Sequence, residues 1–229
     1  PRGRIYLIKQ LLETAEASST THRHLDRCLT CRSCETTCPS GVRYGQLLDI
    51  GRGLMEQNVP RGLLQRAQRR LLRLTLTRPG LFAVFLRLGR LARPALPASL
   101  AAKVPSRQKL KPPAATVRAS RRVLLLEGCV QRAATPRTNN AVRRVLAKLG
   151  VEVVSAPKAG CCGAVNYHLA AHREGLDDLR RNIDAWWPHV EDGAEAVLSS
   201  ASGCGVMLAD YGKLLERDRR RVLLTDRGR

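Results

Sequence analysis

Aromatic residues, acidic residues and long apolar runs are all scarce in this sequence of 229 residues. Aromatic side chains make up only 3% of it, and no Asp or Glu occurs from Gln57 to Leu126. The best candidate for an apolar run, around Leu81 to Leu91, is interrupted by Arg87 and Arg90. It falls short of the roughly 20 residues that cross a bilayer. We therefore expect no membrane-spanning helix.

Three further signals are missing. The opening residues, PRGRIYLIKQLLETAE, lack the long apolar core of a signal peptide, so we expect a cytoplasmic protein. The sequence does not open on Met, which we interpret as a clipped beginning. No strand-like segment is followed by G-x-G-x-x-G, the glycine pattern of dinucleotide and flavin sites. Any two-electron flavin chemistry would then belong to a partner.

The net charge is +21, and the distribution of the charges along the sequence indicates which partners they favour. Arginines alternate with leucines at helical spacing in GLLQRAQRRLLRLTL and LFAVFLRLGRLARPAL, without the aromatics that stack on bases. This pattern favours a pair of basic amphipathic helices that meet a membrane surface or an acidic protein. A solvated basic face is the alternative. We expect no nucleic-acid partner.

One stretch, CLTCRSCETTCPSGV from Cys28 to Val42, carries the strongest signal. Its ligand candidates are Cys28, Cys31, Cys34 and Cys38. Three thiolates spaced in this way can each bind a different iron of one cluster, whereas the cysteine before the proline serves the other cluster in two-cluster ferredoxins. No second triplet exists in this sequence. The spacing fits zinc poorly, since structural zinc sites usually join two separated cysteine pairs. A disulfide is a weaker interpretation still, because closely spaced cysteines in an intracellular chain are more often metal-binding or catalytic. Nearby arginines would favour thiolates, namely Arg27, Arg32 and Arg43.

We expect four segments: a partial ferredoxin-type region at 1–58, basic helices with a Pro-rich linker at 59–120, a cysteine-rich α/β domain at 121–217, and a basic tail at 218–229. The linker itself is expected from about Pro94 to Ser120. In the first region, helical spacing predicts helices at Arg4–Glu16 and Tyr44–Gln57 around the cysteine loop. Their apolar faces would carry Ile5, Ile8, Leu11 and Leu12, and Leu47, Leu48, Leu54 and Met55. His22 and His24 lie in the polar approach to Cys28, and we leave both out of the site.

The second half repeats one unit three times: strand, cysteine turn, helix. The expected strands are Val123–Leu126, Val151–Ser155 and Ala196–Ser199, and the expected helices are Thr135–Leu149, Asn166–Trp187 and Val206–Glu216. The second helix would be stopped by Pro188. Such strands pair in parallel, which puts the turn after every strand at the same edge of the sheet. The predicted fold class is therefore α + α/β, with a helical ferredoxin-type 4Fe-4S region followed by a parallel sheet flanked by helices.

This order predicts that four later cysteines converge as a redox or metal site: Cys129, Cys161, Cys162 and Cys204. The alternative is four separate buried cysteines that act as small apolar residues. His168 and His172 stand four apart on one expected helix, but the catalytic glutamate of the zinc-protease motif is absent. We interpret both as surface or core histidines.

Five segments together closely resemble the iron-sulfur subunits of bacterial glycolate oxidase. They are Cys28–Val42, LLEGCVQ, AGCCGAVNYH, RRNIDAWWP and SGCG. The resemblance implies that Cys28, Cys31 and Cys34 bind one 4Fe-4S cluster and that Cys38 binds another. It also assigns Cys129, Cys161, Cys162 and Cys204 to a cysteine-rich domain. Met207 stands where that domain's pattern has a further cysteine, so a full extra cluster there is not expected.

The resemblance implies an oxidoreductase subunit that has no substrate site of its own. FAD-containing catalytic subunits would oxidise glycolate to glyoxylate, and this subunit would pass their electrons to a membrane acceptor such as quinone. It would make peripheral contact with the cytoplasmic face of the inner membrane. The family has two 4Fe-4S clusters, but the first cysteine run and the second cysteine-rich domain do not occur in this sequence. We therefore expect a fragment that completes neither cluster alone.

Three alternatives remain open at this point. The chain could serve a related system, such as glycerol-3-phosphate dehydrogenase or lactate utilisation. It could be a thiol redox protein of the heterodisulfide-reductase kind, with Cys161 and Cys162 reactive. It could also be a zinc-stabilised basic interaction module.

Overall fold

The computed structural model describes residues 2–14, 18–110 and 120–216. They cluster into two compact units, and each is described by itself. Unit 1 contains the chain up to Leu71 together with Asn166–Glu174, and unit 2 contains the remainder. No helix in the described ranges is long and apolar enough to cross a membrane, as expected. The four-segment division stays a prediction.

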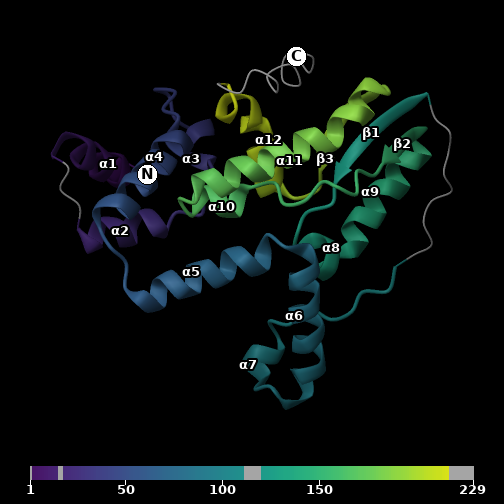
Figure 1. Ribbon diagram of the computed structural model, residues 1–229, viewed down its shortest axis with the longest axis horizontal. Helices are drawn as coiled ribbons and strands as arrows, with labels where there is room; N and C mark the ends of the chain where they lie inside the picture. The colour runs from purple at the N-terminus through teal and green to yellow at the C-terminus, as the bar shows by residue number, and fades with distance from the viewer. Residues whose placement is uncertain (1, 15–17, 111–119, 217–229) are drawn as a thin grey trace. The chain divides into compact units, whose positions relative to one another are not determined.

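Unit 1 is helical (Figure 1). Its helices are α1 (Arg2–Thr14), α2 (Ser19–Asp26), α3 (Ser33–Thr36) and α4 (Tyr44–Asn58), and α5 (Leu63–Leu76) begins within it. The core is formed by the inner faces of the first, second and fourth of these helices, with Ile8, Leu11, Leu25, Tyr44, Leu48 and Met55 buried together. This core lies directly under the cysteine loop, since Cys28 and Cys34 pack against it.

One expectation for unit 1 needs correction. Leu12 is 53% exposed, because a residue next to the buried Leu11 is turned by about 100° around the helix. The polar approach to Cys28, which holds His22 and His24, is helix α2. Ser18 caps it, since its Oγ accepts a hydrogen bond from the Thr21 N–H at 3.1 Å. Glu16, the expected end of the first helix, lies outside the described residues.

Unit 2 is built on a three-stranded parallel sheet with the strand order β2-β1-β3. The strands are β1 (Arg121–Leu126), β2 (Val151–Val154) and β3 (Ala194–Ser199). Val123 of the central strand pairs with Val153 on one side and Ala196 on the other. This central strand is buried along Val123–Leu126, as a strand covered on both faces requires. The predicted fold class is confirmed.

Helices follow each strand. They are α8 (Gln131–Ala134) and α9 (Pro136–Lys148) after β1, α10 (Ala164–His168) and α11 (His172–Glu191) after β2, and α12 (Ser202–Leu214) after β3. α9 packs on β2, and α12 packs on β3. Three elements precede the first strand in the sequence: α6 (Pro79–Ala92), the 3₁₀ turn η1 (Arg93–Ala95) and the single-turn helix α7 (Ala98–Ala101). The last two fall inside the expected linker, whose residues 111–119 lie outside the described ranges, as does the tail 217–229.

The helix expected from Asn166 to Trp187 is wrong at both ends. The chain breaks between α10 and α11, where Ala170 adopts a left-handed φ of 62°. The second helix then passes through Pro188 and ends at Glu191. A proline removes one backbone donor, which a long helix with a buried face can tolerate near its end. His168 and His172 therefore lie on two different helices.

Candidate functional site

The cysteine loop lies between α2 and α4 in unit 1. Cys28 follows the end of α2, Cys31 and Cys34 flank the start of α3, and Cys38 follows its end. All four are free thiols; Cys31 is exposed, and the other three are half-buried. Four thiols are thus held near the surface of a packed helical core.

Two residues with a left-handed backbone conformation turn the chain between the first three cysteines. Thr30 has a φ of 54° and Arg32 a φ of 57°, and neither is a glycine. Each such residue costs on the order of 1 kcal/mol or more and persists only where surrounding contacts fix it. The loop is therefore held in a conformation that the isolated segment would not favour.

Two donors point at sulfur within this loop. The Thr30 N–H donates to Cys28 Sγ at 3.4 Å, and the Ser33 hydroxyl donates to Cys31 Sγ at 3.6 Å. The hydrogen bond from the Ser33 backbone, and then that from its side chain, lowers the pKa of the Cys31 thiol. Hydrogen bonds to a sulfur favour the thiolate, which is the form that binds iron.

The run of four cysteines fits an iron-sulfur cluster on these grounds: accessible thiols, a strained ligand loop and donors aimed at sulfur. In the described residues, no three His, Cys, Asp or Glu side chains are grouped so as to hold a single metal ion. A cubane takes each thiolate on a different iron, so its ligands stand apart. Whether these four residues bind a cluster stays a prediction.

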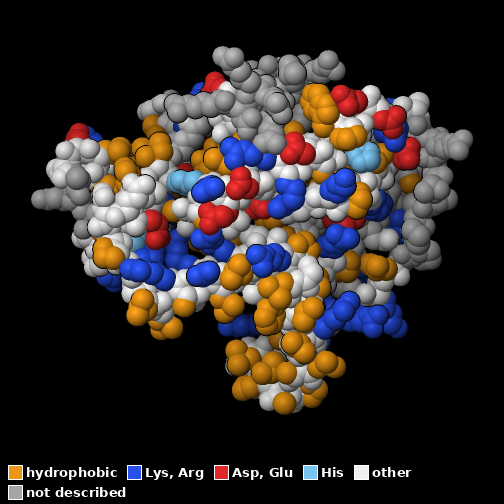
Figure 2. Space-filling model, in the orientation of Figure 1, with side chains coloured by type: hydrophobic (Ala, Val, Ile, Leu, Met, Phe, Trp, Pro, Cys, Tyr) orange, Lys and Arg blue, Asp and Glu red, His pale blue; other side chains and the backbone are white. Residues whose placement is uncertain are grey.

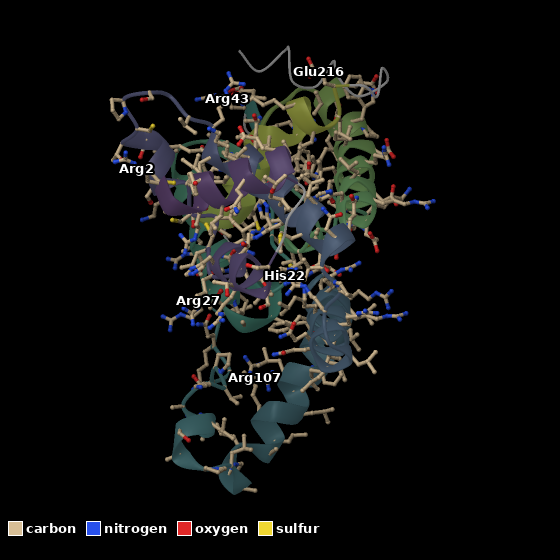
Figure 3. The ribbon with its side chains drawn as sticks, turned by 90° about the vertical axis from the view of Figure 1, so that its left-hand side faces the viewer. Arg2, His22, Arg27, Arg43, Arg107 and Glu216 are labelled. Atoms are coloured by element: carbon tan, nitrogen blue, oxygen red, sulfur yellow. The ribbon has the colours of Figure 1, made fainter. Side chains whose placement is uncertain are left out.

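The arginines named from the sequence differ in their surroundings. Arg27 and Arg43, both labelled in Figure 3, are exposed. Arg32 is half-buried, and its Nε lies 2.8 Å from the place that a Cβ on Gly45 would occupy. The buried arginine beside the loop is Arg52 of α4, at 7% exposure, which sequence reasoning missed. Its buried position on a helix face 24 residues from Cys28 gave no local signal.

The four later cysteines come together at the carboxyl edge of the sheet in unit 2, although they are not among groups placed to hold a single metal ion in the described residues, and their role as a redox or metal site stays a prediction. Cys129 follows β1, the pair Cys161–Cys162 follows β2, and Cys204 lies in the first turn of α12 after β3. Their thiols form a chain of hydrogen bonds from Cys129 to Cys161, then to Cys162 and then to Cys204. The first three are 7%, 0% and 3% exposed, so the chain is sealed from water except at Cys204.

The ends of this thiol chain differ in acidity. The hydrogen bond with Cys161, and then burial, raises the pKa of Cys129. For Cys161, the hydrogen bond with Cys129 lowers the pKa, but the bond with Cys162 and burial outweigh it and raise the pKa to about 12. The hydrogen bond with Cys162 lowers the pKa of Cys204. Cys204 is therefore the thiol that ionises first.

A buried polar network holds the turn that carries the cysteine pair. Asn182 of α11 is fully buried; its Oδ1 accepts from the Gly160 N–H at 2.8 Å, and its Nδ2 donates to the Cys161 carbonyl at 2.7 Å. The Tyr211 hydroxyl of α12 donates to the Cys162 carbonyl at 2.9 Å and lies 3.0 Å from Asn182 Nδ2. Both residues were missed from the sequence, because their partners lie 21 to 49 residues away.

Gly163 closes the same turn. Its φ is +85°, and a Cβ there would lie 2.5 Å from Leu179 Cδ1 and 2.9 Å from the Gly175 carbonyl oxygen. Only glycine fits this approach of α11 to the turn. Met207, at the position where a further cysteine was considered, is 1% exposed and forms part of the core.

The histidines lie outside both cysteine groups. In unit 1, His168 Nδ1 lies 2.9 Å from Asp49 Oδ1, and the His172 ring stacks against Tyr167 at 4.7 Å between centroids. Burial lowers the pKa of His172 and of His22. The interpretation of His168 and His172 as structural side chains agrees with these contacts.

Comparison with known proteins gives a consistent picture. Residues 123–209 match the model of the family described as "Cysteine-rich domain". The whole chain is 53% identical to the glycolate oxidase iron-sulfur subunit of Escherichia coli (strain K12), over 229 residues that cover 56% of that protein. It is 31% identical to the probable glycolate oxidase iron-sulfur subunit of Bacillus subtilis (strain 168), over 95% of this chain and 54% of that protein.

The chain thus spans little more than half the length of these two relatives. No solved structure gives a significant match. The resemblance inferred from the five cysteine-containing and flanking segments is confirmed.

Proposed function

We propose that this chain relays electrons through iron-sulfur clusters in a glycolate-oxidising complex. The premise is that residues 123–209 match the cysteine-rich domain and that the whole chain is similar to the iron-sulfur subunits of glycolate oxidase. The observation that carries the proposal is the cysteine loop of unit 1. Its thiols are accessible, its backbone is strained into one conformation, and N–H and O–H donors point at two of its sulfurs.

In this proposal Cys28, Cys31 and Cys34 hold one 4Fe-4S cluster, and Cys38 contributes to a second one. Such a cluster, when bound, accepts and passes on one electron at a time. The chain's own residues contribute the thiolates and the donors that stabilise them. Ser33 favours the thiolate of Cys31, and the core residue Tyr44 stays protonated beside Cys28, since burial raises its pKa.

The thiols of Cys129, Cys161, Cys162 and Cys204 form a second redox or metal site in the proposal. Three of them are buried and resist ionisation, whereas Cys204 ionises first and is partly open to solvent. A metal or cluster bound there would displace thiol protons, and Cys204 would give up its proton most readily. A thiol redox function of the heterodisulfide-reductase kind would use the same four residues.

The partners follow from what the chain would need. Two-electron oxidation of glycolate requires an FAD-containing subunit, and the electrons require an acceptor such as a membrane quinone. Peripheral membrane contact is supported by the apolar stripe of α6, which we define as Leu81, Val84, Phe85, Leu88 and Leu91. These side chains are 36% to 78% exposed, and hydrophobic side chains gather over α6 and α7 in Figure 2. The arginines of this segment complement anionic lipid on the cytoplasmic face of the inner membrane.

The experiment is anaerobic purification of the complex that contains this protein, followed by iron, sulfide and zinc analysis and by EPR after addition of glycolate. We expect reduced 4Fe-4S signals that require the flavin-containing subunit, and loss of one signal in a Cys31→Ser variant. Zinc without iron or sulfide would refute the proposal and favour the basic interaction module. An intact relay with thiol chemistry lost in Cys161→Ser would favour the heterodisulfide-type alternative.

A further inference from the structure

Arg52 of α4 is the side chain that ties the cysteine loop together. Its Nη2 donates to the carbonyl oxygens of Cys28 at 2.7 Å and Leu25 at 3.0 Å. Its Nη1 donates to the Thr30 hydroxyl at 3.0 Å and to the His168 carbonyl at 3.3 Å. One guanidinium thus meets four oxygens, two of them on the residue that opens the cysteine run and on the left-handed residue behind it.

The loop requires such a tie for two reasons. Leu25 and Cys28 stand at the carboxyl end of α2, where carbonyl groups lack partners within the helix and a cation is favoured by the helix dipole. Thr30 holds a left-handed φ of 54°, which a β-branched residue adopts only when other contacts fix it. Because Thr30 also donates its N–H to Cys28 Sγ, fixing Thr30 fixes the direction of that sulfur's hydrogen bond.

The charge of Arg52 is buried and faces neutral oxygens. The side chain is 7% exposed, and its contacts within the described part of the chain are carbonyl and hydroxyl oxygens. Asp49, three residues earlier on the same helix, is hydrogen-bonded instead to the His168 ring. A buried positive charge acts through a medium of low dielectric constant, so it stabilises added negative charge nearby far more than a solvated arginine does.

We propose that Arg52 is the positioning residue of the Cys28 ligand, and that its charge raises the reduction potential of the cluster bound there. This inference rests on the proposed iron-sulfur function. Arg52 touches the backbone of the ligand residue and not its sulfur, so it acts through Cys28 and Thr30. Reduction adds one negative charge to the cluster, which the buried guanidinium stabilises.

The test compares Arg52→Gln, Arg52→Lys and a control, Arg23→Gln, in the iron-loaded complex. Arg23 stands in the last turn of α2, the helix that leads to Cys28, but it is exposed, so its charge is screened. Two quantities are measured: the reduction potential, by EPR-monitored titration, and the rate at which a chelator removes iron. We expect Arg52→Gln to shift the potential to more negative values and to release iron about tenfold faster, since charge-assisted hydrogen bonds are lost.

The lysine variant separates charge from geometry. An ammonium group keeps the charge but cannot meet four oxygens as the planar guanidinium does. Arg52→Lys should therefore keep most of the potential and still release iron faster, whereas Arg23→Gln should match the unmodified protein in both measurements. Should Arg52→Gln fail to fold, the lysine variant decides, and iron release at the unmodified rate would overturn the inference.

The outcomes also separate this inference from the proposed function. Zinc or an absence of iron in the unmodified protein would overturn both. If the cluster forms normally, and neither its reduction potential nor its rate of iron release changes in the Arg52 variants, only the role of Arg52 would be overturned.

Discussion

Gly163 is the residue at which the least change should do the most damage. An alanine there would adopt a left-handed φ and would overlap Leu179 and the Gly175 carbonyl. We expect Gly163→Ala to lower the free energy of unfolding of unit 2 by about 2–4 kcal/mol, combining backbone strain with overpacking. Urea unfolding followed by the fluorescence of Trp186 and Trp187, both on α11, measures it.

Gly193 supplies the matched control. Its φ of +89° is nearly the same, but a Cβ there meets nothing within 4 Å. Gly193→Ala should therefore cost only the strain, about 1–2 kcal/mol. Equal losses in the two variants would show that the contact with α11 has no part in holding the cysteine turn.

One buried histidine, His22, and one half-buried histidine, His172, make the stability of unit 1 depend on pH. Burial lowers the pKa of His22 and His172 below the ordinary value of 6.5. The unfolded chain then binds more protons than the native one below about pH 6.5, so stability falls as the pH drops through that value. Each histidine contributes a slope of at most about 1.4 kcal/mol per pH unit.

Hydrogen exchange of α2 and α4 between pH 7.5 and 5, corrected for the intrinsic rate, measures this slope. His22→Gln should flatten it in part, and a double variant with His172→Gln should flatten it further. The carboxyl of Asp26, whose pKa is held low by Arg61 in spite of burial, contributes only below about pH 4 and lies outside this window. A slope that both substitutions leave unchanged would contradict the assignment.

The candidate ligand cysteines could be predicted from the sequence, but the side chains that hold the backbone around them could not. Cysteine spacing alone identified the loop from Cys28 to Cys38, and the position of each later cysteine behind a strand predicted their convergence. Arg52, Asn182 and Tyr211 gave no such signal, because an arginine, an amide and a phenol occur on many helices. Their roles depend on contacts with residues 21 to 116 positions away in the sequence, which only the folded chain reveals.

At the scale of elements, α11 and α12 act together as the clamp on the Gly160–Cys162 turn. Asn182→Ala would remove the acceptor of the Gly160 N–H and would leave the Cys161 carbonyl with only the longer hydrogen bond from Arg181 Nη2, at 3.4 Å. We expect a loss of about 2–4 kcal/mol in the unfolding of unit 2, against about 1–2 kcal/mol for Tyr211→Phe. The same Trp fluorescence applies, because Trp186 stacks on Tyr211 with centroids 6.1 Å apart.

The double variant tests whether the two helices are coupled through this clamp. Asn182 and Tyr211 share a hydrogen bond of 3.0 Å, so their separate losses should not add. Strictly additive losses would mean that each side chain holds its carbonyl independently.

Element boundaries show why periodicity has limits. The three strands and their parallel pairing followed from short apolar runs between helical stretches, and the helix after β1 was placed within a residue at each end. The break at Ala170 was not visible, because alanine favours helix and its left-handed φ is imposed by surrounding structure. Pro188 was expected to end the helix, but α11 continues through it to Glu191. The burial of one face of α11 outweighs the loss of one backbone donor.

At the scale of the whole molecule, the apolar stripe of α6 should bind anionic vesicles. The exposed Phe85 and Leu88 would enter the lipid interface, and the exposed Arg87 of the same helix would meet the headgroups. We expect sedimentation with vesicles rich in phosphatidylglycerol, weakened by salt and reduced about tenfold or more by a Phe85→Asp, Leu88→Asp double variant.

Val145→Asp is the control for this experiment. Val145 is also exposed, at 56%, but lies on α9, away from the stripe in the sequence. Binding that falls equally in both variants, or that persists on neutral vesicles at high salt, would show that the stripe does not recognise an anionic bilayer.

The order of the two units along the chain limits which chimaeras can be made by recombining this gene with that of a relative. The chain leaves unit 1 near Leu71 and returns to it for Asn166–Glu174, where the His168 carbonyl meets Arg52 and its ring meets Asp49. No single crossover in the gene could transplant unit 1 intact, since its last nine residues are encoded inside the other unit. A chimaera joined at the α5 boundary would inherit Asp49 and Arg52 from one parent and their partner from the other. Residues Asn166–Glu174 must therefore be inherited together with the rest of unit 1 if these contacts are to be kept.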